Sequence, residues 1–161
     1  MEFVYKLLKR LRWRAVRKVI GGNGKLLDIG AQDLYFYNQL KNRFDIVLSD
    51  FDPKLDIIKK EDVQNLSFED NTFDVVLCQE VLEHVQDPVR AIKELKRVCR
   101  KRLIITVPNE PYFTLLRGFK WDREHLWALT PRLFKTYLGR PVYEKKIVCK
   151  RYYLGVWEFE K

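Results

Sequence analysis

Short apolar runs alternate with amphipathic helical segments along most of this chain, and this alternation limits the folds that the chain can adopt. The strongest apolar run covers residues 73–78, and three further runs cover 25–29, 44–49 and 103–107. Each run is long enough for a strand, and helical spacing fills much of the sequence between them. Strands that alternate with helices predict an α/β fold built on a mostly parallel sheet.

A weaker run at 57–59 follows the run at 44–49 after only about seven residues. A crossover between parallel strands normally takes a dozen residues or more. Either a loop replaces the usual helix at this connection, or the third strand lies elsewhere.

Helical spacing predicts helices at 4–20 and 34–43, and two more after the pairs Asp87-Pro88 and Thr130-Pro131. In both pairs the first residue is a typical N-cap, and proline suits the first helical position. Two strand-like runs follow the last helix, at 142–149 and 152–159, and they predict a hairpin-like pair.

The composition is that of a folded protein with a core, because 47% of the 161 residues are hydrophobic. No stretch approaches the roughly 20 apolar residues of a membrane span, and the first residues lack the order of a signal peptide. The three cysteines are dispersed and form no C-x-x-C pair, which argues against disulfides and zinc. A reduced cytoplasm is the expected location.

Positive charge is concentrated in two arms. Residues 1–20 carry a net charge of +6, residues 117–151 carry +7, and the rest of the chain is acidic within a total of +9. Such arms can recruit an anionic partner, which would be nucleic acid, an acidic protein or anionic lipid. The alternative is an ordinary solvated surface.

The predicted sheet also predicts where a ligand binds, since ligands of open parallel sheets lie at the carboxyl ends of the strands. Those ends are rich in carboxylates, and no phosphate-binding G-x-x-x-x-G-K-[ST] motif is present. An acidic rim suits a ligand with hydroxyls, an amine and a positive centre. Asp50, just after the second strand, is placed to bind the two hydroxyls of a ribose. Alternatively, Asp50 and Asp52 only cap a turn.

The run at 65–85 resembles a segment of class I S-adenosylmethionine-dependent methyltransferases, in the broad group that includes the ubiquinone- and menaquinone-biosynthesis enzymes. It contains Phe73-Asp74-Val75-Val76 and then Val81-Leu82-Glu83-His84, as that family does. The likeness extends over roughly residues 25–138. The first motif departs from the family pattern, because Gln32 and Leu34 replace two of its three glycines and only Gly30 is kept.

The resemblance implies a Rossmann-like, mostly parallel sheet of seven strands, flanked by helices and ending in antiparallel strands. On this basis the chain divides into a basic amphipathic helix with a glycine-rich joint at 1–24 and a compact single methyltransferase domain at 25–161. The expected function is methyl transfer from S-adenosylmethionine to an unidentified acceptor, either a small molecule or a macromolecule.

The resemblance also implies a role for individual residues toward S-adenosylmethionine. Asp28 and Gly30 would shape the loop beneath the methionine end, and Gln32 would offer an amide to its carboxylate. Asp50 would bind the ribose. The adenine contacts would come from Asp62 and Val63, and Gln79 would line the methionine moiety.

A general base is needed only if the acceptor arrives protonated. The candidates are His125, Glu80, His84 and Glu110, with His125 preferred because it lies in the segment expected to cover the acceptor. No cluster of histidines and acids has metal-ligand spacing, so no metal site is expected. The competing hypothesis is a non-catalytic module that binds nucleic acid or a membrane on a degenerate methyltransferase fold.

Overall fold

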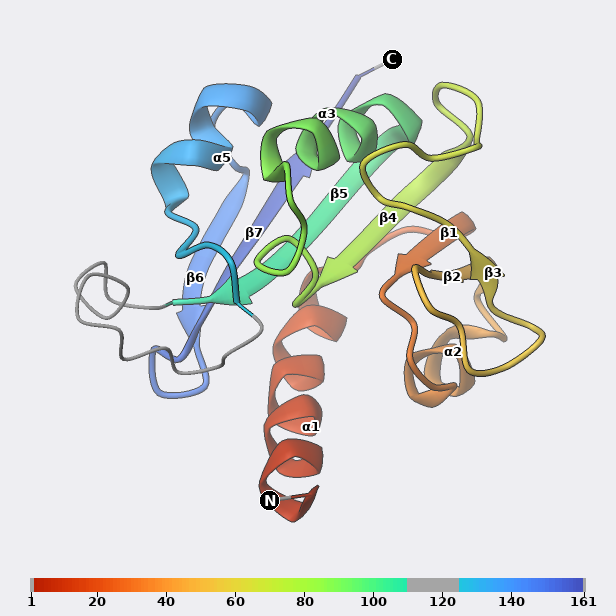
Figure 1. Ribbon diagram of the computed structural model, residues 1–161, viewed down its shortest axis with the longest axis horizontal. Helices are drawn as coiled ribbons and strands as arrows, with labels where there is room; N and C mark the ends of the chain where they lie inside the picture. The colour runs from red at the N-terminus through yellow and green to blue at the C-terminus, as the bar shows by residue number, and fades with distance from the viewer. Residues whose placement is uncertain (1, 110–124, 161) are drawn as a thin grey trace.

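The computed structural model describes residues 2–109 and 125–160, which form a seven-stranded sheet with helices on both faces (Figure 1). The strand order is β3-β2-β1-β4-β5-β7-β6. The first five strands in this order pair in parallel, and β7 pairs antiparallel with both β5 and β6. The strands are β1 (Gly24–Ile29), β2 (Phe44–Asp50), β3 (Lys59–Lys60), β4 (Phe73–Gln79), β5 (Cys99–Pro108), β6 (Tyr143–Ile147) and β7 (Tyr152–Glu158). The predicted Rossmann-like fold is confirmed.

Strand β4 lies between β1 and β5, and every one of its residues is buried. Its near-continuous apolar sequence is what a parallel strand needs when both faces are covered. On one face its Val76 packs with the apolar side of α3 (Pro88–Val98) and α5 (Pro131–Leu138). On the other face Val75 and Leu77 pack with α1 (Glu2–Val19) and α2 (Tyr35–Leu40).

The two predicted helix starts differ in detail. At α3, an Oδ1 atom of Asp87 accepts a hydrogen bond of 2.9 Å from the backbone N–H of Arg90, so the predicted N-cap is confirmed. At α5, the side chain of Thr130 makes no capping hydrogen bond, and the prediction of a second side-chain cap is wrong. Helix α5 still begins at Pro131, whose fixed φ suits the first turn.

The short connection after β2 contains no helix. Strand β3 is only two residues long and pairs with Ser49 and Asp50, so the third strand begins later than the run at 57–59 suggested. The connecting loop leaves Phe51 and Ile57 largely exposed. A loop has therefore replaced the crossover helix, which explains why this connection is shorter than the usual dozen residues.

Helix α1 packs on the same core as the sheet. Trp13, Val16 and Ile20 are at most 4% exposed, and they join a cluster with Leu26 and Phe36. The rings of Trp13 and Phe36 lie 5.0 Å apart, centroid to centroid. The segment that the sequence set apart at 1–24 is thus docked on the rest of the chain. Within the described residues, no helix is long and apolar enough to cross a membrane.

The docking of α1 predicts that Trp13→Ala lowers the free energy of unfolding by about 3–5 kcal/mol, since a large buried ring is lost. Urea denaturation followed by circular dichroism measures this change. The matched control is Arg14→Ala on the exposed side of the same helix, which should change stability by less than about 0.5 kcal/mol. If Trp13→Ala lowered the free energy of unfolding no more than Arg14→Ala does, α1 would contribute little to the core.

Candidate functional site

The strand order reverses between β1 and β4, since the chain adds β2 and β3 on one side of β1 and then returns to its other side. Such a reversal opens a crevice at the carboxyl edge of the sheet. In register, Ile29 of β1 lies between Ser49 of β2 and Cys78 of β4. The residues that follow these three strands therefore meet at one edge.

Gly30 follows β1 with a φ of +80°, in the region that favours glycine. A Cβ atom at this position would lie 2.4 Å from Cγ2 of Val81, which is too close. The backbone N–H groups of Gly30 and Ala31 both donate to the carbonyl of Ser49, which ties the loop to β2. The retained glycine of the first motif is therefore required by the turn and by the approach of Val81.

Asp28 is the second-to-last residue of β1 and is only 3% exposed. Burial raises the pKa of its carboxyl from 3.8 to about 7. The negative charge of Asp33 adds to this rise, whereas the positive charges of Lys9 and Arg12 oppose it. A buried acid with a strongly shifted pKa is a frequent mark of a functional site.

Gln79 ends β4 at 6% exposure. Its Oε1 accepts a long hydrogen bond of 3.4 Å from Nε of Arg12. No acceptor in the described part of the chain lies within hydrogen-bond distance of its buried Nε2. An unsatisfied buried donor is costly, and it suits a site where a ligand supplies the missing acceptor.

Arg12 is a site residue that the sequence analysis missed. It comes from α1, is 6% exposed, and places Nη1 3.6 Å from Oε2 of Glu80 and its guanidinium 5.3 Å from the ring centre of Tyr152. Lys9, one turn earlier, forms an ion pair of 2.7 Å with Asp33. The helix thus delivers two of its seven basic residues to the carboxyl edge. No sequence signal separates these two from the other five.

Glu80 adopts a φ of +56°, which is strained for a residue with a side chain. Its Oε1 accepts a hydrogen bond of 3.0 Å from the Thr106 hydroxyl. Burial raises the pKa of its carboxyl, while Arg12 and that hydroxyl act in the opposite direction. Glu80 is therefore held at the edge in a fixed orientation beside Gln79.

The other predicted cofactor residues are Asp50, Asp62, Val63 and Gln32, and they differ in their contacts and in their burial. Asp50 accepts a hydrogen bond of 2.9 Å at Oδ1 from the backbone N–H of Asp52, so one of its oxygens does cap the turn. Asp62 accepts 2.8 Å and 3.1 Å hydrogen bonds at Oδ1 from Gln64. Val63 is 5% exposed and packs in the core, whereas the side chain of Gln32 is exposed.

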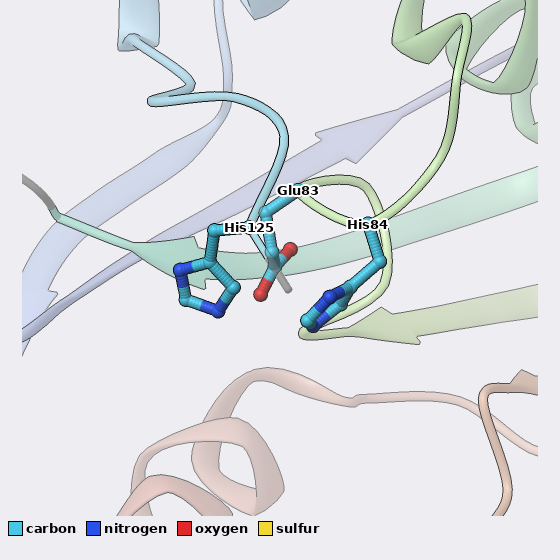
Figure 2. Close-up of side chains that lie close together, drawn as sticks. All are labelled: Glu83, His84 and His125. Atoms are coloured by element: carbon cyan, nitrogen blue, oxygen red, sulfur yellow. The ribbon is translucent and has the colours of Figure 1, made fainter. Parts of the chain in front are cut away.

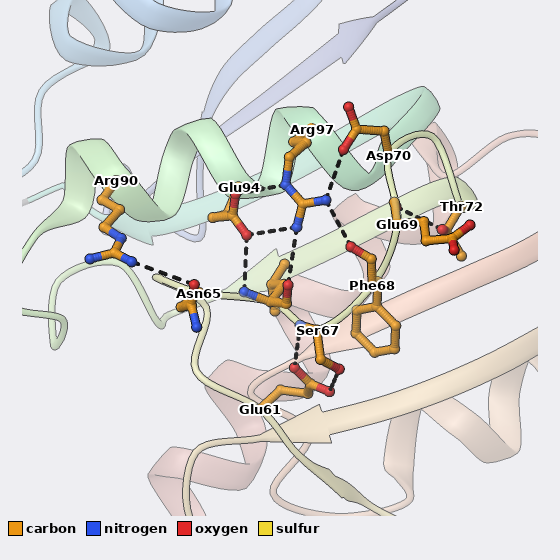
Figure 3. Close-up of polar contacts among 11 residues, drawn as sticks. Glu61, Asn65, Ser67, Phe68, Glu69, Asp70, Thr72, Arg90, Glu94 and Arg97 are labelled. Carbon is orange, nitrogen blue, oxygen red and sulfur yellow. Dashed lines mark hydrogen bonds and ion pairs between the residues drawn. The ribbon is translucent and has the colours of Figure 1, made fainter.

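The loop that carries Asp62 and Val63 is fastened to α3 by Arg97 (Figure 3). Its guanidinium donates to the carbonyls of Phe68 at 2.7 Å and Leu66 at 3.1 Å. It also pairs with Glu94 at 2.7 Å and Asp70 at 2.9 Å. Glu94 also accepts a hydrogen bond of 3.0 Å from the backbone N–H of Leu66, so several side chains hold the loop against α3.

Two of the predicted base candidates lie together. The rings of His84 and His125 are 4.8 Å apart, and Figure 2 shows the carboxylate of Glu83 beside them. The expectation of no metal site rested on spacing in the sequence, whereas the fold brings His125 next to the Glu83-His84 pair. The adjacent Glu83-His84 pair was the only available signal. Glu110, the fourth candidate, lies outside the described residues.

The fold is that of the Rossmann-like α/β proteins, in which ligands bind at the carboxyl edge of the sheet. In this chain the strand order reverses, the loop after β1 requires glycine, and the carboxyl edge is acidic. Within this class, residues 27–105 match the family model described as a methyltransferase domain. The match includes the last three residues of β1, all of β2 and β4, and the residues Gly30, Asp50 and Gln79 at the carboxyl edge.

Known proteins agree with this assignment of the fold. An uncharacterized protein of Methanocaldococcus jannaschii is 35% identical over 96 residues, which is 53% of this chain and 41% of that protein. A solved protein of Pyrococcus horikoshii superposes with a TM-score of 0.73 at 21% identity, over 98% of this chain and 91% of that one. The N-methyltransferase NodS of Bradyrhizobium japonicum, solved with S-adenosyl-L-homocysteine, gives 0.66 at 16% identity, over 98% and 87%. The chain thus spans less than half the length of the curated relative.

Burial of Asp28 predicts a pH-dependent stability. The folded state holds this proton to a higher pH, so its contribution to stability is complete below 3.8 and is lost as the pH rises through about 7. The loss corresponds to about 4 kcal/mol. The side chain of the Asp28→Asn variant cannot ionise. Its free energy of unfolding, relative to that of the original protein, should therefore rise by that amount between about pH 4 and pH 9. Urea denaturation measures this difference. The control, Asp45→Asn at an exposed carboxylate, should show no such rise. A difference independent of pH would contradict the buried acid.

Proposed function

We propose that this chain is a methyltransferase that uses S-adenosylmethionine and an acceptor not yet identified. The observation that carries the proposal is the match to a methyltransferase domain over the residues that form the carboxyl edge. The relative with bound S-adenosyl-L-homocysteine supports the choice of cofactor. The finer grouping with the ubiquinone- and menaquinone-biosynthesis enzymes rests on the run at 65–85 alone and is part of the proposal.

The residues of the edge fit this cofactor. Gly30 allows the tight turn after β1 that packs against Val81, and the buried Nε2 of Gln79 offers a donor to the methionine carboxylate. The second carboxylate oxygen of Asp50 is available to a ribose hydroxyl. Burial raises the pKa of the Asp28 and Glu80 carboxyls, and a positive sulfonium near them would favour their ionised forms. The sulfonium supplies an activated methyl group. Binding and orientation by these residues are worth up to about 7–11 kcal/mol of a reaction barrier.

The roles of Asp62 and Val63 toward adenine, and of Gln32 toward the methionine end, stay predictions. So do the roles of Glu80, His84, His125 and Glu110 as proton acceptors, which only a protonated acceptor molecule requires. The basic arms keep their predicted role with an anionic partner, and five of the basic residues of α1 are exposed: Lys6, Arg10, Arg14, Arg17 and Lys18. A cytoplasmic location belongs to the same proposal.

The first test is the affinity for S-adenosyl-L-homocysteine measured by calorimetry. Asp50→Ala should weaken binding by about 1.5–3 kcal/mol, the cost of a lost hydrogen bond to a charged group. The matched control is Asp52→Ala, two residues away, where a carboxylate whose side chain is 75% exposed should matter by less than about threefold. No binding of the unmodified protein at millimolar ligand would favour the non-catalytic alternative.

Gln79→Met separates a ligand contact from a structural role. Methionine has a similar volume and removes both the unsatisfied Nε2 and the acceptor of the long 3.4 Å hydrogen bond from Arg12, so the stability of the ligand-free protein should change little. Affinity for S-adenosyl-L-homocysteine should fall by about tenfold or more. Gln39→Met, at an exposed glutamine, should change neither quantity. If Gln79→Met lowers stability and leaves affinity intact, Gln79 serves the fold and not the ligand.

A further inference from the structure

Three side chains with metal-ligating atoms converge next to the carboxyl edge of the sheet. Glu83, His84 and His125 each offer one ligand atom, and all three atoms lie within 4.8 Å of one another. Figure 2 shows the Glu83 carboxylate beside both imidazole rings, with Glu83 and His84 on the turn after β4 and His125 on a separate segment.

Backbone hydrogen bonds hold the two segments together. The N–H groups of Leu126 and Trp127 both donate to the carbonyl of Glu83, at 2.8 Å and 3.3 Å. The indole N–H of Trp127 donates to the carbonyl of Val85 at 2.9 Å. The segment that begins at His125 is therefore fixed against the turn of Glu83 and His84 by contacts to backbone carbonyls.

The depth of the cluster also suits a cation. Glu83 is 1% exposed, whereas His84 is exposed and leaves a path from solvent to the cluster. A divalent ion bound at Glu83 would place positive charge beside this buried carboxylate.

We propose that Glu83, His84 and His125 form a binding site for one divalent transition-metal ion. Two imidazole nitrogens and one carboxylate are a ligand set that zinc, cobalt and iron accept in proteins. Three protein ligands leave at least one coordination position for another molecule. The ion would hold an oxygen atom of the acceptor at that position, a role that rests on the proposed function, whereas metal binding itself does not.

The experiment uses the full chain without a histidine tag, stripped of metal with a chelator. The chain has only two histidines, so any imidazole bound to a metal is one of this pair. Cys149 is an exposed thiol and a competing ligand, and Cys149→Ser is therefore the background for every variant. Zinc is titrated by calorimetry, and cobalt by its visible absorption, which reports the coordination geometry.

The background protein should bind one zinc ion per chain, and cobalt should give the spectrum of a four- or five-coordinate site. His84→Ala and His125→Ala should each weaken zinc binding by about 100-fold or more. Glu69→Gln, at an exposed carboxylate away from the cluster, should leave zinc affinity unchanged. Zinc should also raise the melting temperature of the background protein and not that of the histidine variants.

The proposal is overturned if zinc binds no more tightly than about 100 μM. It is equally overturned if both histidine variants keep the affinity of the background protein, since the cluster is then a hydrogen-bonded group only. The affinity for S-adenosyl-L-homocysteine, measured on the metal-free protein, separates the two proposals. Cofactor binding without zinc binding overturns only the metal site, and zinc binding without cofactor binding overturns only the proposed function.

Discussion

The burial of β4 on both faces is the constraint on which the rest of the structure depends. A strand whose every residue is buried needs a layer of helices above and below the sheet, and α1 and α2 on one side and α3 and α5 on the other provide them. Because β4 also pairs with β1, the chain must return across the sheet after β3. That return places Gly30, Asp50 and Gln79 at one edge, so the packing of the core and the location of the site have the same cause.

The docking of α1 joins this core to the chemistry of the edge. Trp13 and Val16 bury the helix against the sheet, and this orientation directs Arg12 toward Gln79 and Glu80. The guanidinium of Arg12 lies between two acceptors. The amide oxygen of Gln79 accepts its hydrogen bond, and the buried carboxylate of Glu80 is stabilised by its positive charge. A segment that looks like a separate basic arm in the sequence therefore contributes to the electrostatics of the candidate site.

The sequence predicts the parts of this structure that depend on local pattern. The β4 run, the cap at Asp87 and the position of Gly30 follow from residue type and spacing, and the structure places each as expected. What depends on tertiary packing could not be predicted. Thr130 has the right residue type for a cap and makes no such bond, Arg12 cannot be told from its basic neighbours, and His125 reaches His84 only through the fold.

The contact between Arg12 and Tyr152 has a consequence for how the protein is made. Helix α1 is synthesised before β7, yet its Arg12 lies over the ring of Tyr152 on that strand. Because β7 pairs antiparallel with β5, neither the sheet nor the environment of Arg12 is complete until that strand leaves the ribosome. During synthesis the apolar side of α1 has no complete surface on which to pack. The surroundings of Arg12 are thus complete only when β7 is in place, and a chain cut before β7 would lack them.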